Sequence, residues 1–231
     1  MKFSLLCPTR SRPGAFASMV ASAAATAAHP EDIEVIAYID FDDPELQDYG
    51  AGVSGGVTVS HVVGPRCVLS DAWNRASRGA RGNVWMMAAD DLRFISLGWD
   101  DIVNDALNWY PDDIALLYGR DGHADERMAT HPFVTRRWVN IVGRFTAPYF
   151  QADYCDLWLH EVAKKVGRAV YLPQLLIEHL HPSFGLGTWD QTHKERMERA
   201  EGADLPAVWE RTEPERDAEA ARLTGFIEVS A

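Results

Sequence analysis

Cysteine is scarce in this 231-residue chain, which contains only Cys7, Cys67 and Cys155. The three lie far apart, and no two of them form a CxxC pair. An odd number of isolated cysteines argues against a disulfide-linked scaffold and against a structural zinc site. We therefore expect three free thiols in a reducing compartment.

Long hydrophobic runs are also missing. The first apolar run ends after five residues and is followed by Arg10, Arg12 and Pro13, so a buried strand explains it better than an export signal. The alanine-rich stretch of residues 15–28 is too short and too rich in Ser and Thr to span a bilayer. These observations predict a cytoplasmic protein that has no membrane contact.

Basic residues are outnumbered, since 22 Lys and Arg stand against 34 Asp and Glu and give a formal net charge of −12. That balance disfavours a general binder of nucleic-acid backbones, which needs a basic face. Hydrophobic residues make up 47% of the chain, which is enough for a large buried core. Length and composition together favour one α/β domain with a short appendage.

The first half alternates between apolar runs and helical patterns. The predicted strands are residues 3–7, 33–39, 57–63 and 84–88, and the predicted helices are residues 13–28 and 70–77, the latter with Ser70 as N-cap. Apolar strands separated by helices imply a mostly parallel, Rossmann-like sheet with helices on both faces. The second half is less regular, with short elements predicted at residues 114–118, 131–139, 156–166, 170–172, 175–177, 191–199 and 214–223.

Polar side chains follow three of the four predicted strands. They are Thr9, Arg10 and Arg12 after the first strand, Asp40 and Asp42 after the second, and Asp90 and Asp91 after the fourth. Ligands of open parallel sheets bind outside the carboxyl ends of the strands. We therefore expect these side chains to line one ligand site.

Asp90 and Asp91 are adjacent carboxylates that follow a buried strand directly. Such a pair repels itself and loses solvation, so it needs a cation or hydrogen-bond donors. Mg²⁺ and Mn²⁺ commonly join one or two carboxylates to substrate phosphates. The alternative is a simple turn in which Asp91 caps the next helix.

The order of these motifs, at residues 8–13, 40–43, 64–66, 70–74 and 87–91, resembles the nucleotide-binding half of GT-A-fold glycosyltransferases, especially the inverting family-two group. The resemblance covers roughly residues 3–101 and, more loosely, residues 150–182. It implies a GT-A catalytic domain over residues 1–187, with a nucleotide-sugar-binding half to about residue 101 and an acceptor half after it. Residues 188–231 would form a polar helical C-terminal appendage.

The resemblance also implies roles for the polar residues. Residues implied in binding the nucleotide-sugar donor are Thr9, Arg10, Arg12, Asp40, Asp42, Arg66, Asn74 and Asp90. Asp91 corresponds to the last acid of the family's DxD motif and would bind a divalent cation, Mn²⁺ or Mg²⁺. The triplet Ala89-Asp90-Asp91 lacks the first acid of that motif.

Two later segments supply further candidates. Residues 152–158 resemble the acidic motif that carries the family's catalytic base, so Asp156 or Asp153 would deprotonate the acceptor. We favour Asp156 because it is predicted as a helix N-cap, although it could be that cap and nothing more. His179 and His181, two residues apart on an extended segment, point to the same side. The resemblance implies His179 as a metal ligand, with His181 as the alternative.

The sequence past Gly187 is polar and charged. Residues 185–189 could form a lid over the donor phosphates, which Lys194, Arg196 and Arg199 would then approach.

The function implied is transfer of a sugar from a nucleotide diphosphate to an unidentified acceptor by direct displacement, with inversion. On resemblance alone, small stand-alone members in phages suggest a hydroxymethylated DNA base as one acceptor. Three alternatives stay open: a sugar nucleotidyltransferase, a non-catalytic nucleotide-sugar or carbohydrate-binding protein, and a hydrolase with its metal on His179, His181 and an acid.

Overall fold

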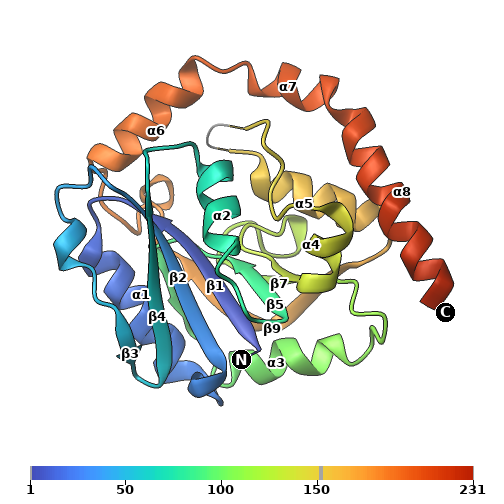
Figure 1. The fold of residues 1–231 in the computed structure, drawn as a ribbon, viewed down its shortest axis with the longest axis horizontal. Coiled ribbons are helices and arrows are strands. Elements are labelled where there is room, and N and C mark those ends of the chain that lie inside the picture. The colour runs from blue at the N-terminus through green and yellow to red at the C-terminus, as the bar shows by residue number, and fades with distance from the viewer. Residues whose placement is uncertain (1, 151–152, 231) are drawn as a thin grey trace.

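The computed structural model describes residues 2–150 and 153–230, and the strands found there form one sheet (Figure 1). The strands are β1 (Phe3–Thr9), β2 (Ile33–Asp40), β3 (Gly52–Ser54), β4 (Val57–Gly64), β5 (Val84–Met87), β6 (Leu92–Phe94), β7 (Leu116–Arg120), β8 (Phe133–Thr135) and β9 (Ala169–His179). Their order across the sheet is β3-β4-β2-β1-β5-β8-β7-β9-β6.

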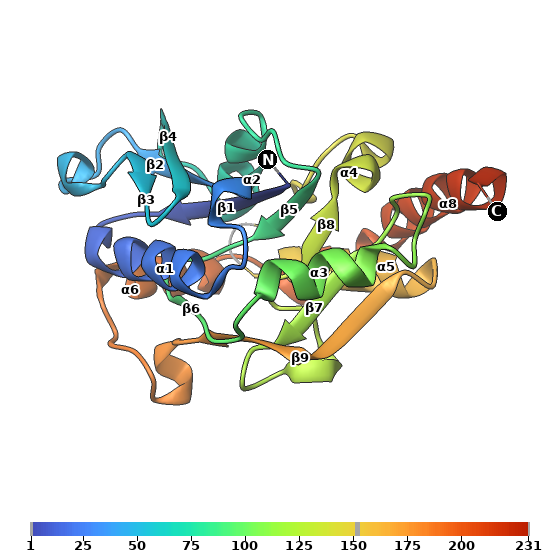
Figure 2. The same ribbon diagram turned by 90° about the horizontal axis from the view of Figure 1, so that it is seen from below.

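Helices cover both faces of this sheet (Figure 2). They are α1 (Pro13–Thr26), α2 (Leu69–Ser77), α3 (Trp99–Leu107), α4 (Arg136–Val142), α5 (Cys155–Lys165), α6 (Gln191–Glu201), α7 (Leu205–Arg211) and α8 (Glu213–Ser230). Helices α1 and α3 pack on one face, and α2, α4 and α5 pack on the other.

The alternation of side chains along β1 explains why both faces are covered. Leu5 and Cys7 belong to the core under α1 and α3, whereas Leu6 belongs to the core under α2 and α5. Successive strand residues point to opposite faces, so a strand that is apolar throughout requires a layer of helices on each side. The predicted α/β architecture is confirmed.

The centre of the sheet is parallel, because β2 pairs with β1 and β4, and β1 with β5, all in the same direction. Three short strands, β3, β6 and β8, run antiparallel to their neighbours. Strands of three residues carry too little periodicity to be recognised in a sequence. Neither β3 nor β6 was predicted, and β8 falls inside the segment predicted at residues 131–139.

Strand β9 differs from the prediction and matters for the site. The sequence predicts two pieces around Pro173, but residues 169–179 form one strand. The pairing of β9 with β7 is regular as far as Leu172 and then shifts, which accommodates a residue without a backbone N–H. Beyond the shift, β9 pairs with β6 so that His179 lies opposite Leu92. This register brings His179 beside Asp91.

Two predicted caps are wrong. Helix α2 begins at Leu69 after Val68, and the Ser70 hydroxyl donates instead to the Phe150 carbonyl, 2.9 Å away. Helix α5 begins at Cys155, and its N-cap is Tyr154, whose φ of 73° is left-handed. Asp156 therefore lies in the first turn of the helix and is not its N-cap.

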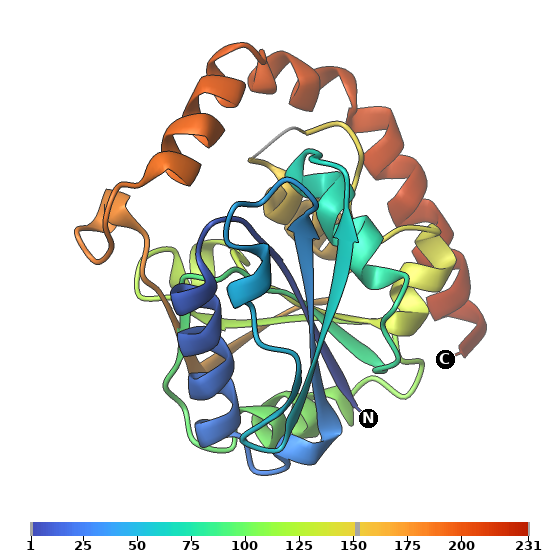
Figure 3. The same ribbon diagram turned by 60° about the vertical axis from the view of Figure 1, so that its left-hand side comes forward.

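The C-terminal helices form an arc around the sheet domain (Figures 1 and 3). Helix α8 packs against α4 and α5, with Leu223 fully buried in the same core as Trp158. The start of α6 lies at the carboxyl ends of β1 and β2, where Thr192 donates to the carbonyl of Arg10. In the described part of the chain, no helix has the length and apolar character needed to cross a membrane.

Candidate active site

A cavity of about 560 Å³ opens at the carboxyl ends of the central strands. Most of the predicted site residues line it: Thr9, Arg10, Arg12, Asp40, Asp90, Asp91, Asp153, Asp156, His179 and His181. They come from β1, β2, β5, α5 and β9, from the segments that follow these strands or, for Asp153, from the segment just before α5. The expectation that strand-end side chains meet at one site agrees with this placement.

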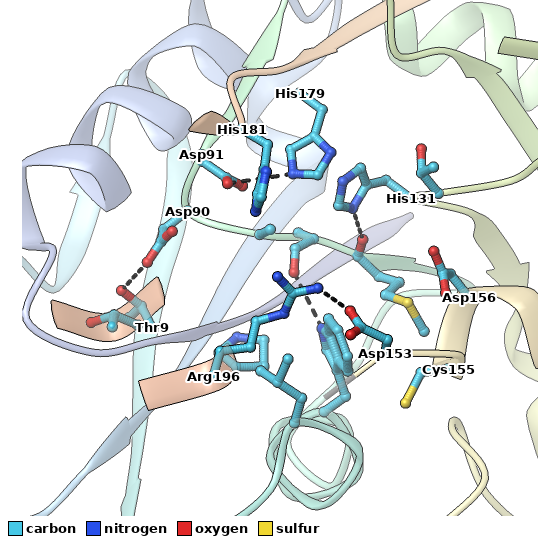
Figure 4. A pocket seen from close by; sticks show the side chains of 18 of the residues that line it. Thr9, Asp90, Asp91, His131, Asp153, Cys155, Asp156, His179, His181 and Arg196 are labelled. Atoms are coloured by element: carbon cyan, nitrogen blue, oxygen red, sulfur yellow. Dashed lines mark hydrogen bonds and ion pairs between the residues drawn. The ribbon is translucent and has the colours of Figure 1, made fainter. Parts of the chain in front are cut away.

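Asp90 is held by the last residue of β1 and by the loop that follows it. Thr9 Oγ1 donates to one carboxylate oxygen at 2.7 Å (Figure 4). Arg12 Nη1 donates to the other at 3.1 Å. Burial raises the pKa of Asp90 to about 6, although the charge of Arg12 opposes the shift. Because both oxygens are used, Asp90 fixes the first loop against the end of β5.

Asp91, unlike Asp90, has a partner among the described residues for only one of its two carboxylate oxygens. Its Oδ2 lies 3.4 Å from His179 Nε2, whereas its Oδ1 is buried and has no hydrogen-bond partner. Burial opposes ionisation, but the hydrogen bond and charge of His179 outweigh it and hold the pKa of Asp91 well below its ordinary value. Asp91 is therefore an ionised carboxylate with one oxygen available to a ligand.

Two further histidines stand next to this pair. The ring of His131 lies edge-on to that of His179, with centroids 4.7 Å apart, and the ring of His181 is 5.3 Å away on another side. Burial lowers the pKa of His131 and of His181 to about 4, so both are neutral near pH 7. His181 Nδ1 accepts from the Ser183 N–H, which leaves only Nε2 for another partner.

The residues present fit a divalent cation that is shared with a substrate. Among residues 2–150 and 153–230, no three His, Cys, Asp or Glu side chains are grouped closely enough to hold an ion by themselves. Asp91 and His179 could supply two ligands, and the free Asp91 Oδ1 faces no competing donor. Mg²⁺ and Mn²⁺ sites of this kind are completed by phosphate oxygens and water.

The other end of the cavity carries the predicted nucleoside-binding residues. Arg10 Nη1 donates to Asp40 at 3.1 Å and to Asp42 at 2.7 Å. Burial raises the pKa of Asp40 against the opposing charge of Arg10. Tyr38, Cys67 and Trp73 line the same end and make it more apolar.

Asp156, in the first turn of α5, and Asp153, just before that helix, face the cavity on the side away from Thr9 (Figure 4). Asp153 forms an ion pair with Arg196 of α6, whereas Asp156 has no cationic partner among the described residues. Asp156 Oδ1 accepts the Leu157 N–H at 2.8 Å. Burial raises the pKa of Asp156 to about 6, which suits a group that must accept a proton near neutral pH. Residue 152, the first of the predicted motif, lies outside the described residues.

Three predicted donor-binding residues do not line the cavity. Asp42 and Arg66 stand near its edge, paired with Arg10 and with Glu195 respectively. Asn74 is used inside the protein: its amide oxygen accepts from Phe145 N and Thr146 N, and its nitrogen donates to the Thr146 carbonyl. Both lone pairs of the amide oxygen and one N–H of the nitrogen are used inside the protein, so the side chain is held away from the cavity.

Asn74→Ala is therefore expected to affect stability and not donor binding. Loss of the three hydrogen bonds leaves partly buried backbone groups unpaired, which should cost about 1–3 kcal/mol of the free energy of unfolding. Urea denaturation measures this loss, and calorimetric titration with UDP and GDP measures donor binding. A weakened nucleotide affinity in a stably folded variant would contradict this assignment.

The sequence reasoning missed several lining residues. Asp121 directly follows β7, so the expectation that polar residues after a strand line the site could have identified it. Its oxygens accept hydrogen bonds from the Thr130 hydroxyl and from the N–H groups of residues 123–125. His123 and His131 lie in the connection between β7 and β8, where no sequence pattern marks them.

The segment after Gly187 also contributes to the cavity. Arg12 binds both Asp190 oxygens, at 2.7 and 2.8 Å, and contacts His193. Burial opposes the ionisation of Asp190, but Arg12 lowers its pKa to about 2, so the pair is ionic. Of the predicted basic residues, Arg196 lines the cavity and Lys194 does not, and the side chain of Arg199 lies outside the described part.

Comparison with solved structures identifies the fold. No protein-family model matches the sequence, and no curated protein matches it either. The mannosyltransferase PcManGT from Pyrobaculum calidifontis, solved with GDP-Man and Mn²⁺, superposes with a TM-score of 0.64 at 14% identity, over 99% of this chain and 73% of that one.

Two more structures are similar. TarS 1–349 from S. aureus, solved with UDP, gives a TM-score of 0.58 at 14% identity over 77% of this chain and 60% of that chain. Glucosyl-3-phosphoglycerate synthase from Mycobacterium tuberculosis, solved with Mg²⁺ and UDP, gives 0.53 at 14% identity, over 85% and 78%. The match to a longer TarS structure spans only 36% of that chain. This chain has the fold of GT-A-type glycosyltransferases, as its sequence predicted.

Proposed function

We propose that this protein is a glycosyltransferase that uses a divalent cation to transfer a sugar from a nucleotide diphosphate to an acceptor hydroxyl. The observation that carries the proposal is the meeting of Asp91 and His179, from the ends of β5 and β9, in a cavity that also contains Asp40, Arg10 and Asp156. The solved structures that share the fold include complexes with GDP-Man, UDP, Mn²⁺ and Mg²⁺, which supports the same ligand classes here.

In this proposal, the two ends of the cavity bind different parts of the donor. The apolar end near Tyr38 and Trp73 suits a nucleoside, and Asp40 can accept a hydrogen bond from its base. Asp91 and His179 would hold the cation beside the diphosphate, and the bound cation would stabilise the charge of the departing diphosphate. Arg12 keeps Asp90 and the first loop in place around that position.

Asp156 is the proposed general base. It stands at the opposite side of the cavity from Thr9, it carries no ion pair with a described residue, and its raised pKa lets it hold a proton taken from a hydroxyl. The base would lie on one side of the donor sugar and the leaving diphosphate on the opposite side. This arrangement favours a single displacement at the anomeric carbon, with inversion. Asp153 is the weaker candidate because Arg196 neutralises it.

The proposal predicts diphosphate release that requires both an acceptor and a cation. A panel of UDP- and GDP-sugars with Mn²⁺ or Mg²⁺, tested with oligosaccharide and hydroxymethylated-DNA acceptors, should give nucleoside diphosphate with one donor class. The matching nucleotide with Mn²⁺, at 100 times its Kd, should also add about 2.7 kcal/mol to the free energy of unfolding. This added stability appears as a higher Tm.

Other outcomes of this panel would favour the rival functions. Pyrophosphate release from a nucleoside triphosphate and a sugar phosphate would indicate a nucleotidyltransferase. Donor binding without turnover for any acceptor would indicate a binding protein. Hydrolysis that needs metal but no nucleotide would indicate a hydrolase.

A further inference from the structure

Two buried acceptor atoms in the cavity have no hydrogen-bond partner. Among the described residues, five buried side-chain polar atoms lack a partner, and two of the five, Asp91 Oδ1 and His131 Nε2, belong to residues that line this cavity. Buried polar atoms are nearly always paired in folded proteins, so an exception marks a place where a water molecule or an ion can bind. Both residues also contact His179, so the two unpaired atoms belong to one cluster of side chains.

The protonation of the His131 ring follows from its other nitrogen. His131 Nδ1 lies 3.1 Å from the carbonyl oxygen of Met87, and a carbonyl can only accept. Nδ1 therefore carries a proton, and in the neutral tautomer that this contact selects the lone pair lies on Nε2. The free atom is an acceptor, and it needs an O–H or N–H donor or a cation.

The position of His131 ties it to the cation site. Its ring lies edge-on beside that of His179, with centroids 4.7 Å apart (Figure 4). The described residues contain no group of three side chains that could bind one ion together, so His131 does not stand as a third direct ligand. Mg²⁺ and Mn²⁺ usually keep several water molecules when they bind to proteins, and each bound water is a strong donor.

We propose that His131 is a positioning residue that accepts a hydrogen bond from a water molecule on the cation held by Asp91 and His179. The inference rests on the proposed function, because it requires that cation. Through this contact His131 orients the hydrated ion and raises its affinity, while Met87 fixes the orientation of the ring.

Two substitutions separate this role from a structural one. In His131→Asn the amide nitrogen can replace Nδ1 and keep the bond to Met87, but the acceptor at Nε2 is lost. In His131→Gln the longer side chain can place its amide oxygen near the Nε2 position, while the donor to Met87 is lost. The positioning role predicts that His131→Asn weakens cation binding more than His131→Gln does. A structural role of the bond to Met87 predicts instead that His131→Gln is the less stable variant and the one that binds the cation more weakly.

The measurement is the Kd for Mn²⁺, from the electron paramagnetic resonance signal of the free ion, with saturating UDP or GDP. We expect His131→Asn to raise this Kd about tenfold, as is typical for loss of a contact to a metal's ligands, and His131→Gln to raise it less. Thermal denaturation of each variant shows that it is folded. Equal Mn²⁺ affinity in wild type and His131→Asn, or weaker binding in Gln than in Asn, would overturn the inference and leave the proposed function intact. If the wild-type protein binds no Mn²⁺ with either nucleotide, the proposed cation site and this inference both fail.

Discussion

Asp91→Asn is expected to reduce sugar transfer by about 10²–10³-fold, the range found when one group that stabilises transition-state charge is removed. Asp91 Oδ1 is buried without a hydrogen-bond donor, and its Oδ2 lies near His179, which is the arrangement that the proposed cation site requires. An amide of the same shape keeps the packing but loses the negative charge that the cation needs. The rate of diphosphate release at saturating Mn²⁺, compared with wild type, measures the effect.

Asp101→Asn is the matched control for Asp91→Asn. It makes the same chemical change at a half-exposed aspartate of α3, where the nearest described partner is His29 at 3.5 Å. Its activity should equal that of wild type. Full activity of Asp91→Asn, with the same dependence on Mn²⁺, would remove Asp91 from the cation site.

Asp156→Asn should abolish most transfer and yet make the protein more stable. The asparagine amide cannot take up the proton of the acceptor hydroxyl, and loss of a general base lowers the rate about 10²–10⁴-fold. In the wild type, protonation of a base whose pKa is about 6 should lower kcat/KM about tenfold for each pH unit below 6. The pH profile of transfer between pH 4.5 and 8 is the measurement.

The gain in stability follows from the direction of the pKa shift. Burial raises the pKa of Asp156 in the folded protein above its unfolded value, so the native state binds the proton more tightly. The ionised carboxylate therefore lowers stability fully at pH values above the folded pKa, and the penalty disappears below the unfolded pKa, near pH 4. A rise of the pKa from 3.8 to about 6 corresponds to a penalty of at most about 3 kcal/mol at pH 7.5, and solvent screening of the half-buried side chain reduces it. Asp156→Asn should therefore gain about 1 kcal/mol, and the Tm should rise by about 2–4 °C.

Asp153→Asn distinguishes the two acids at the start of α5. It removes the ion pair with Arg196, which is partly exposed and contributes little to stability. Its transfer activity should fall far less than that of Asp156→Asn, and the pH profile should keep its midpoint near 6. If Asp153→Asn instead loses activity and Asp156→Asn keeps it, the two roles are reversed.

The sequence predicts the parts of the fold that depend on long apolar segments. Strands β1, β2 and β5 are nearly continuous buried apolar runs, because both faces of the sheet are covered there, and the residues that follow them include Asp91, while Thr9 and Asp40 end β1 and β2. The short antiparallel strands were not predictable, because three residues cannot show a period. Strand β6 is the important case, since its pairing with β9 places His179 beside Asp91.

Site residues could be predicted only where they follow a recognisable strand or motif. Asn74 was assigned to the donor site by its position in a motif, but three hydrogen bonds to the chain at residues 145–146 decide its role, and no local pattern reveals them. His131 was missed for the opposite reason. Its significance lies in an unpaired ring nitrogen, a property that exists only in the folded protein.

The central claim is that Asp91, delivered by the end of one strand, meets a cation and a nucleotide diphosphate in the cavity that also contains Thr9 and Asp40. A crystal grown with Mn²⁺ and UDP or GDP, with diffraction data collected at the manganese absorption edge, tests it most directly. We predict an anomalous peak in direct contact with an Asp91 oxygen and with the diphosphate. A nucleotide bound in this cavity with manganese away from Asp91, or a nucleotide bound at another surface, would contradict the account.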